Sequence, residues 1–176
     1  MSLLVRKITR GKWSIGEEVE AVNADAITQC LKTQDNTLSV WQIKDESDIN
    51  QSILAMAAAN EMLSKIDVVM LTEQALHDKN ISIDATPGLT PCTNLVGTHR
   101  DLSQLNVAHL GVISELIADE IRKGNVKSFT LSTLKNILVD AIKSGELESS
   151  SLSESVREKV EKHLKHLEEE AKKKSQ

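Results

Sequence analysis

The chain has 176 residues, of which 40% are hydrophobic and 27% charged, and its formal net charge is −5. This hydrophobic content excludes a wholly disordered chain, and no uncharged stretch approaches the roughly 20 apolar residues that a membrane-spanning helix needs. Aromatic side chains are scarce, with two Trp, one Phe and no Tyr, which disfavours recognition through aromatic anchors or base stacking.

The first part of the chain alternates between strand-like and helical segments. Residues 3–9 and 37–43 have the period of β-strands, and in the second run Trp41 lies on the face opposite to the aliphatic side chains. Between the two strands, Asn23 is expected to cap a short helix.

A longer helix follows over residues 46–64, with Asp45 as its cap, because apolar side chains recur there every three or four positions. The almost continuous apolar run 66–71 predicts a buried strand. A single helical turn at 73–78 and a short strand at 81–84 complete this part of the chain.

No strand is expected after Pro91. The apolar spacing there predicts three helices, over residues 101–123, 130–144 and 152–171. Their expected N-caps are Asp101, Thr130 and Ser151.

These elements predict an α+β or α/β fold. We expect a small mixed sheet of about four short strands, some of them parallel, with two helices in the N-terminal half and a three-helix C-terminal part that packs on one face of the sheet. The segments are a sheet region 1–86, a connecting loop 87–100, a helical region 101–148, and a Ser-rich linker with an amphipathic helix 149–176. At this length we expect them to form one compact domain.

The C-terminal helix has a narrow apolar stripe surrounded by charged side chains. The stripe consists of Val156, Val160, Leu164, Leu167 and Ala171. Such a narrow seam needs a partner, which can be the domain itself, a second copy of the chain or another protein. Leu164 and Leu167 are therefore candidate binding residues.

The negative charge is concentrated in one block. Residues 44–84 carry eight acidic side chains against three lysines, which equals the whole net charge of −5. Phosphates repel such a block, whereas a basic protein partner would be attracted. Asp45, Glu46 and Asp48 open the block and are candidate binding residues; the alternative is a solvated acidic surface without a partner.

Reactive side chains are densest in the long connection 86–101, and loops of this length are often functional. An enzyme would use Cys92 as nucleophile, His99 as base and Arg100 as an anion clamp. The structural alternative is that Asp101 caps a helix and that Cys92 fills the core as a small apolar side chain.

Cofactor, metal and nucleic-acid sites are disfavoured. The chain lacks a glycine-rich phosphate motif, so no cofactor is expected. His163 and His166 lie three positions apart among lysines without a third ligand, so no metal site is expected. A basic run near the N-terminus offers some support for nucleic-acid binding, although the net acidity opposes it; the run is Arg6, Lys7, Arg10, Lys12 and Trp13.

The function expected from the sequence is that of a small soluble cytoplasmic protein without enzymatic activity. It would act as an accessory, inhibitory or regulatory subunit, through an acidic surface and the C-terminal helix, with a protein partner or a second copy. The alternatives are an enzyme with its site at 86–101 and a nucleic-acid-binding regulator. Trp13 is the one aromatic residue expected to be an exposed anchor, because Trp41 and Phe129 are assigned to the core.

Overall fold

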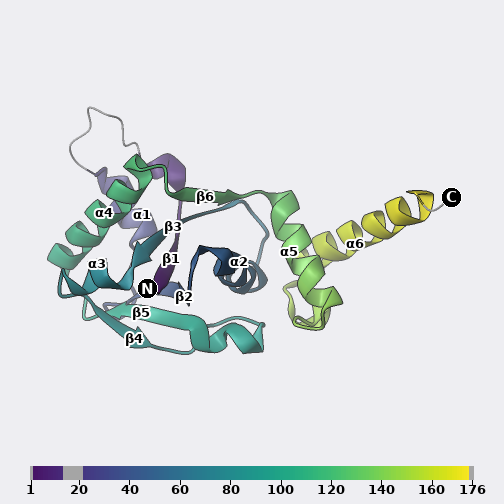
Figure 1. Ribbon diagram of the computed structural model, residues 1–176, viewed down its shortest axis with the longest axis horizontal. Helices are drawn as coiled ribbons and strands as arrows, with labels where there is room; N and C mark the ends of the chain where they lie inside the picture. The colour runs from purple at the N-terminus through teal and green to yellow at the C-terminus, as the bar shows by residue number, and fades with distance from the viewer. Residues whose placement is uncertain (1, 14–21, 175–176) are drawn as a thin grey trace.

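The computed structural model describes residues 2–13 and 22–174. At its centre is a six-stranded sheet in the order β4-β5-β2-β1-β3-β6, in which every neighbouring pair is antiparallel (Figure 1). The strands are β1 (Leu3–Ile8), β2 (Leu38–Ile43), β3 (Ile66–Thr72), β4 (Ser82–Ala85), β5 (His99–Ser103) and β6 (Val126–Phe129). The mixed α and β fold is confirmed, whereas the predicted parallel pairs and the four-stranded sheet are wrong.

The two strands that the sequence did not predict are β5 and β6. The β5 sequence, HRDLS, is mostly polar and lacks the alternation of a strand, while β6 has only four residues. Both strands are specified by their neighbours rather than by their own pattern, because β5 fills the place between β2 and β4, and β6 pairs with β3. The predicted loop 87–100 and the start of the predicted helix at residue 101 are corrected accordingly.

Helices cover both faces of the sheet (Figure 1). They are α1 (Ala24–Cys30), α2 (Ile49–Ala58), α3 (Glu73–His77), α4 (Val107–Arg122), α5 (Leu131–Lys143) and α6 (Glu154–Lys174). Helices α1, α3 and α4 pack on one face, and α2 and α5 pack on the other. The prediction that the C-terminal helices share one face is wrong, because β6 runs along the edge of the sheet between α4 and α5 and carries the chain to the opposite face.

A hydrophobic core lies on each face of the sheet. Successive strand residues point to opposite faces, so Leu4 enters the core beneath α1 and α4 while Val5 enters the core beneath α2, and both side chains are 0% exposed. Val68 and Val69 of β3 divide in the same way. Burial on both faces explains why β3 appears as a continuous apolar run in the sequence.

The helix ends confirm some predicted caps and correct others. The side chain of Thr130 accepts a hydrogen bond from the Thr133 backbone amide and caps α5, as predicted. Helix α4 is capped by Asn106, which forms a reciprocal capping box with His109. The predicted cap Asp101 is wrong for this reason, since it lies within β5.

The second predicted helix is shorter than expected. Residues 46–48 form a 3-10 turn, η2 (Glu46–Asp48), which Asp45 caps through the Ser47 amide, and α2 follows from Ile49 to Ala58. Beyond α2, the Ser153 hydroxyl donates a hydrogen bond shared between the Glu61 and Asn60 carbonyl oxygens, which lie 2.9 and 3.1 Å from Oγ. The segment that follows α2 is thereby tied to the segment that precedes α6.

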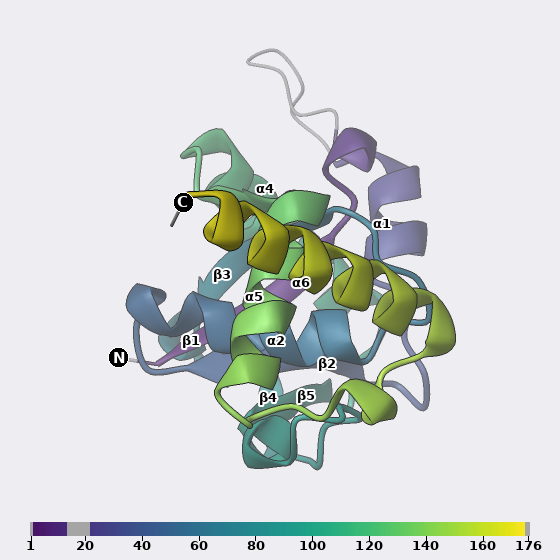
Figure 2. The same ribbon diagram turned by 90° about the vertical axis from the view of Figure 1, so that its right-hand side faces the viewer.

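Helix α6 crosses the outer side of α5 and extends away from the sheet (Figures 1 and 2). It begins at Glu154, and the hydroxyl of Ser151 bonds instead to the Glu148 carbonyl oxygen within a 3-10 turn, η4 (Ser149–Ser151). The predicted capping role of Ser151 is therefore wrong. No helix within the described ranges is both long enough and apolar enough to cross a membrane.

Candidate functional site

The fold separates two of the three residues predicted to act together in catalysis. His99 and Arg100 are consecutive in β5, so their side chains point to opposite faces of the sheet. The Arg100 guanidinium donates hydrogen bonds to the Gly97 and His99 carbonyl oxygens, at 2.8 and 2.7 Å. Arg100 is thereby occupied by its own strand and by the preceding turn, η3 (Thr93–Thr98).

Cys92 is wholly buried, at 0% exposure, in the core that also contains α2 and Leu95. Burial raises the pKa of its thiol, because the thiolate would lose its hydration there. A nucleophilic cysteine needs a stabilised thiolate and access to a substrate. Cys92 has neither, so it is described better as a small apolar side chain that fills the core.

His99 does belong to a polar network, with partners that the sequence did not single out. Thr86 follows β4, whose antiparallel register with β5 brings it beside His99. The Thr86 hydroxyl donates to the Asp101 carboxylate, and Thr86 Oγ1 lies 2.9 Å from both Asp101 Oδ2 and His99 Nδ1. Because a hydroxyl has one hydrogen, His99 Nδ1–H is the donor to Thr86, and Nε2 of the neutral ring carries a lone pair.

Burial and close packing favour the neutral imidazole. Burial lowers the pKa of His99, although Asp101 acts in the opposite direction. The ring meets Trp41 edge to face, with 5.1 Å between the centroids. Gly88 closes over both, because a Cβ there would lie 2.6 Å from the Trp41 ring and 2.9 Å from His99 Cβ. The network can accept a hydrogen bond or a proton at Nε2.

The network lies beside a split in the centre of the sheet. Strands β1 and β2 are paired only from Leu3–Ile43 to Val5–Trp41, and beyond this point they are not paired. The Arg6 guanidinium bridges the split by donating to the Ser39 carbonyl oxygen at 2.7 Å and to the Cys30 carbonyl oxygen at 2.6 Å.

A cleft of about 510 Å³ opens at this split. We call it the central cleft. The polar and charged residues of its lining are Arg6, Lys7, Lys32, Gln34, Asp35, Thr37, Ser39, Asn60, His99 and Asp101. Its apolar lining includes Trp41, Met56 and Leu89.

Positive charge in the central cleft is only partly balanced. Burial lowers the pKa of Arg6 to about 10. Burial, and then the neighbouring Arg6 charge, lower the pKa of Lys7. Within the described part of the chain, no carboxylate forms an ion pair with Arg6, Lys7 or Lys32. The cleft therefore holds two cations, Arg6 and Lys7, whose charged forms are destabilised.

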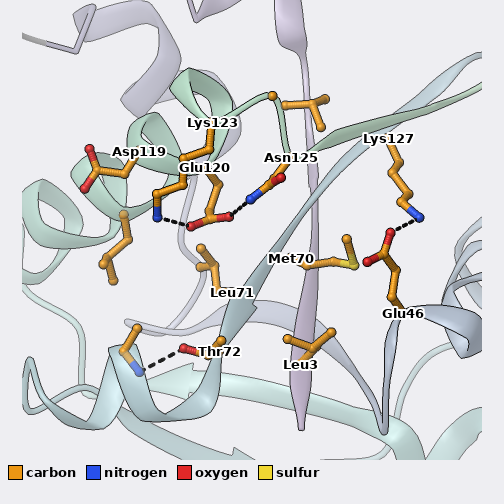
Figure 3. A pocket seen from close by; sticks show the side chains of 14 residues that line it. Leu3, Glu46, Met70, Leu71, Thr72, Asp119, Glu120, Lys123, Asn125 and Lys127 are labelled. Atoms are coloured by element: carbon orange, nitrogen blue, oxygen red, sulfur yellow. Dashed lines mark hydrogen bonds and ion pairs between the residues drawn. The ribbon is translucent and has the colours of Figure 1, made fainter. Parts of the chain in front are cut away.

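A second hollow, of about 580 Å³, lies between β3, β6 and the end of α4 (Figure 3). Its charged side chains all have ion-pair partners, and Asp119 is paired with Arg122 outside the lining. Glu120 accepts hydrogen bonds from Lys123 at 2.8 Å and from Asn125 at 2.7 Å, and Lys127 forms an ion pair with Glu46. Because these charges are already compensated, the central cleft is the stronger candidate for a charged ligand.

The acidic block does not form one surface. Asp45, Glu46 and Asp48 lie beyond the Ile43 end of β2, whereas Asp67 pairs with Ile8 at the opposite end of β1. Several of the carboxylates are already engaged, among them Glu46 with Lys127. Asp45, Glu46 and Asp48 lie together just before α2 and form a cluster.

Trp13 is not an exposed anchor. It is 4% exposed, and its indole Nε1 donates a hydrogen bond to Cys30 Sγ in the core beneath α1 and α4. The expectation of exposure is wrong because α1 folds back over the end of β1 and supplies both a hydrogen-bond acceptor and an apolar cover.

The apolar seam of α6 faces the domain for most of its length. Val156 and Val160 are 0% exposed, and Leu164 and Leu167 are partly buried against the same core. The structure thus shows the first of the three expected partners, the domain itself, along this part of the seam. Leu164 and Leu167 remain available to a partner only through their exposed portions.

A groove of about 400 Å³ runs between α5 and α6. We call it the α5–α6 groove. Its lining consists of Leu131, Lys135, Lys159, Lys162, His163 and His166, without a carboxylate among the residues that the structure describes. Leu131 is 45% exposed although it is a large apolar side chain. His163 is held by Asn136, at 2.7 Å from Nε2 to Oδ1.

Metal ligation has no support in the described residues, where no group of three or more His, Cys, Asp or Glu side chains could hold an ion. Comparison of the chain with family models, curated proteins and solved structures finds no match. Function is therefore inferred from the central cleft and the α5–α6 groove alone.

Sequence reasoning found some members of these sites and missed others. Arg6 and Lys7 belong to the basic run near the N-terminus, but nothing in the local sequence indicates that β1 and β2 diverge beside them. No sequence pattern indicates that Thr86 contacts His99. Asp101 could have been found by strand alternation, because it is two residues from His99 and shares its face.

Proposed function

We propose that the protein is a non-enzymatic accessory or regulatory protein, and that it binds an acidic, partly apolar segment of a protein partner in the α5–α6 groove. The observation that carries this proposal is the combination of an exposed Leu131 with three lysines, Lys135, Lys159 and Lys162, in one groove. Exposed apolar side chains rimmed by charge are typical of interaction sites.

The position of α6 supports the same proposal. The helix crosses α5 (Figure 2) and extends beyond the domain (Figure 1), and its side chains from Glu168 to Lys173 are exposed. A partner can therefore approach the groove without contact with the sheet. The acidic cluster of Asp45, Glu46 and Asp48 lies on η2, at the start of α2, and we propose it as a secondary contact for basic groups of the partner.

Charge reversal in the groove tests the proposal. Tagged wild-type protein, the double variant Lys159→Glu/Lys162→Glu and the control Lys165→Glu are compared in cross-linking pull-downs at low and moderate salt. Lys165 lies on the same exposed helix but does not line the groove. We expect a partner that the wild type and the control retain equally, with binding by the double variant about tenfold weaker.

Salt should weaken the wild-type complex because the rim charges are solvent-exposed. Equal retention by all three proteins would place the contact elsewhere and contradict the proposal. Recovery of no specific partner would contradict it as well. Light scattering tests for self-association. If the wild type forms a concentration-dependent dimer that the double variant does not form, the groove binds a second copy of the chain instead of another protein.

A further inference from the structure

Backbone carbonyl oxygens hold the Arg6 guanidinium, and it forms no ion pair with a carboxylate among the residues that the structure describes. Two of its five N–H groups donate to the Ser39 and Cys30 carbonyl oxygens. Its Nε is buried and has no hydrogen-bond partner within the part of the chain that the structure describes. Arg6 lines the central cleft, and its position is set by backbone atoms from β2 and from the last residue of α1.

Other positive charges line the same cleft and favour the binding of an anion. Lys7 and Lys32 line the same cleft as Arg6, Lys32 from the segment after α1. Two carboxylates, Asp35 and Asp101, also line it, and Asp101 accepts hydrogen bonds from Ser39 and Thr86. The three cations outnumber the carboxylates, and an incoming anion would reduce the repulsion between Arg6 and Lys7.

The shape and walls of the cleft limit the size of such an anion. Its volume of about 510 Å³ is within the range of roughly 300–1,000 Å³ that small-molecule sites occupy. Trp41, Met56 and Leu89 give it an apolar side, and Thr37 and Ser39 add hydroxyl groups. A phosphate group offers more acceptor oxygens than a carboxylate, which suits a site with donors from a guanidinium and two ammonium groups.

We propose that the central cleft binds a small organic phosphate of nucleotide size, with its phosphate oxygens at Arg6, Lys7 and Lys32 and its less polar body against the side that Trp41 and Met56 line. This site is separate from the α5–α6 groove. It requires no partner protein and no chemical step.

The probes are inorganic pyrophosphate, which tests the phosphate contacts, and ATP, which tests the size of the site. Binding is measured by titration calorimetry on the full chain at moderate salt. The test variant is Lys7→Gln/Lys32→Gln, because both lysine residues are exposed and neither belongs to a hydrophobic core. The control is Lys79→Gln, an exposed lysine outside the cleft. Arg6→Gln is a third variant, interpreted only if it folds.

We expect pyrophosphate to bind the wild type and the control equally, ATP to bind more tightly, and the double variant to lose at least tenfold in affinity for both. Trp41 should report pyrophosphate binding by a change in fluorescence that Trp13→Phe retains and Trp41→Phe loses. Absence of binding by both probes, or equal binding by the double variant, would overturn the site. ATP binding no tighter than pyrophosphate binding would overturn the nucleotide size.

Discussion

The indole Nε1 of Trp13 donates a hydrogen bond to Cys30 Sγ over 3.3 Å, and both side chains are 4% exposed. The Thr9 backbone amide donates to the same sulfur, at 3.2 Å. Cys30 thus links the end of β1 to the end of α1, and the Cys30 carbonyl oxygen accepts from Arg6 at the cleft. One residue therefore connects a buried core to the wall of the proposed ligand site.

Replacement of Trp13 should show that it belongs to the core. We expect Trp13→Ala to lower the free energy of unfolding by about 3–5 kcal/mol, the usual cost of truncating a buried aromatic side chain. Trp13→Phe should cost less, since it keeps most of the apolar volume and loses a hydrogen bond worth about 1 kcal/mol. Urea denaturation followed by circular dichroism measures both. A change below about 0.5 kcal/mol for Trp13→Ala is the effect of a typical surface residue and would contradict the burial.

Gly88 should be intolerant of a side chain. A Cβ at this position would lie 2.6 Å from the Trp41 ring, and such overpacking costs about 1–3 kcal/mol. We expect Gly88→Ala to lower the melting temperature and to alter the Trp41 fluorescence. Gly97→Ala is the matched control, because its Cβ would meet no atom within 4 Å. Equal effects of the two substitutions would show that the loop does not pack on Trp41.

The buried His99 should make stability depend on pH. Its pKa is lowered in the folded state from the ordinary value of 6.5, so below that pH the unfolded chain binds more protons than the folded one. The stability that His99 contributes is present above pH 6.5 and is lost as pH falls through the folded pKa. We expect His99→Gln to flatten the fall in unfolding free energy in this window, measured by denaturant titrations at several pH values. Parallel curves for the two proteins would contradict the lowered pKa.

Both cysteines should react slowly with thiol reagents in the folded protein. Cys92 is 0% exposed and its thiol pKa is raised by burial, and Cys30 is 4% exposed beneath Trp13. We expect little labelling by Ellman's reagent at neutral pH, and labelling of both thiols once the chain is unfolded. Rapid reaction of Cys92, compared between Cys92→Ser and Cys30→Ser variants, would restore the cysteine-enzyme interpretation.

Local sequence pattern predicted those elements whose own residues determine them. The strands that contain Val5, Val40 and Val68 have enough apolar side chains to be recognised without knowledge of their neighbours. The Thr130 cap was found for the same reason, because a cap bonds to amides within one turn. The seam of α6 likewise indicated a helix that needed a partner.

The central cleft could not be predicted in this way. It depends on where the pairing of β1 and β2 stops, and on Thr86 lying beside His99 across two strands. These are contacts between segments far apart in the chain, and the same local residues are compatible with several strand orders. His99 and Arg100 looked like partners because they are adjacent in sequence, but adjacency in a strand separates their side chains.

The sequence by itself determined the mixed α and β character, the positions of its most apolar strands, several helix ends and the seam of α6, since each follows from periodicity or from a contact within a few residues. Only the tertiary structure decided the antiparallel strand order, the burial of Trp13 and Cys92, and the meeting of Arg6, Lys7 and Lys32 at one cleft. The physical reason is that burial and electrostatic environment depend on which distant segments pack together, and local periodicity carries no information about that choice.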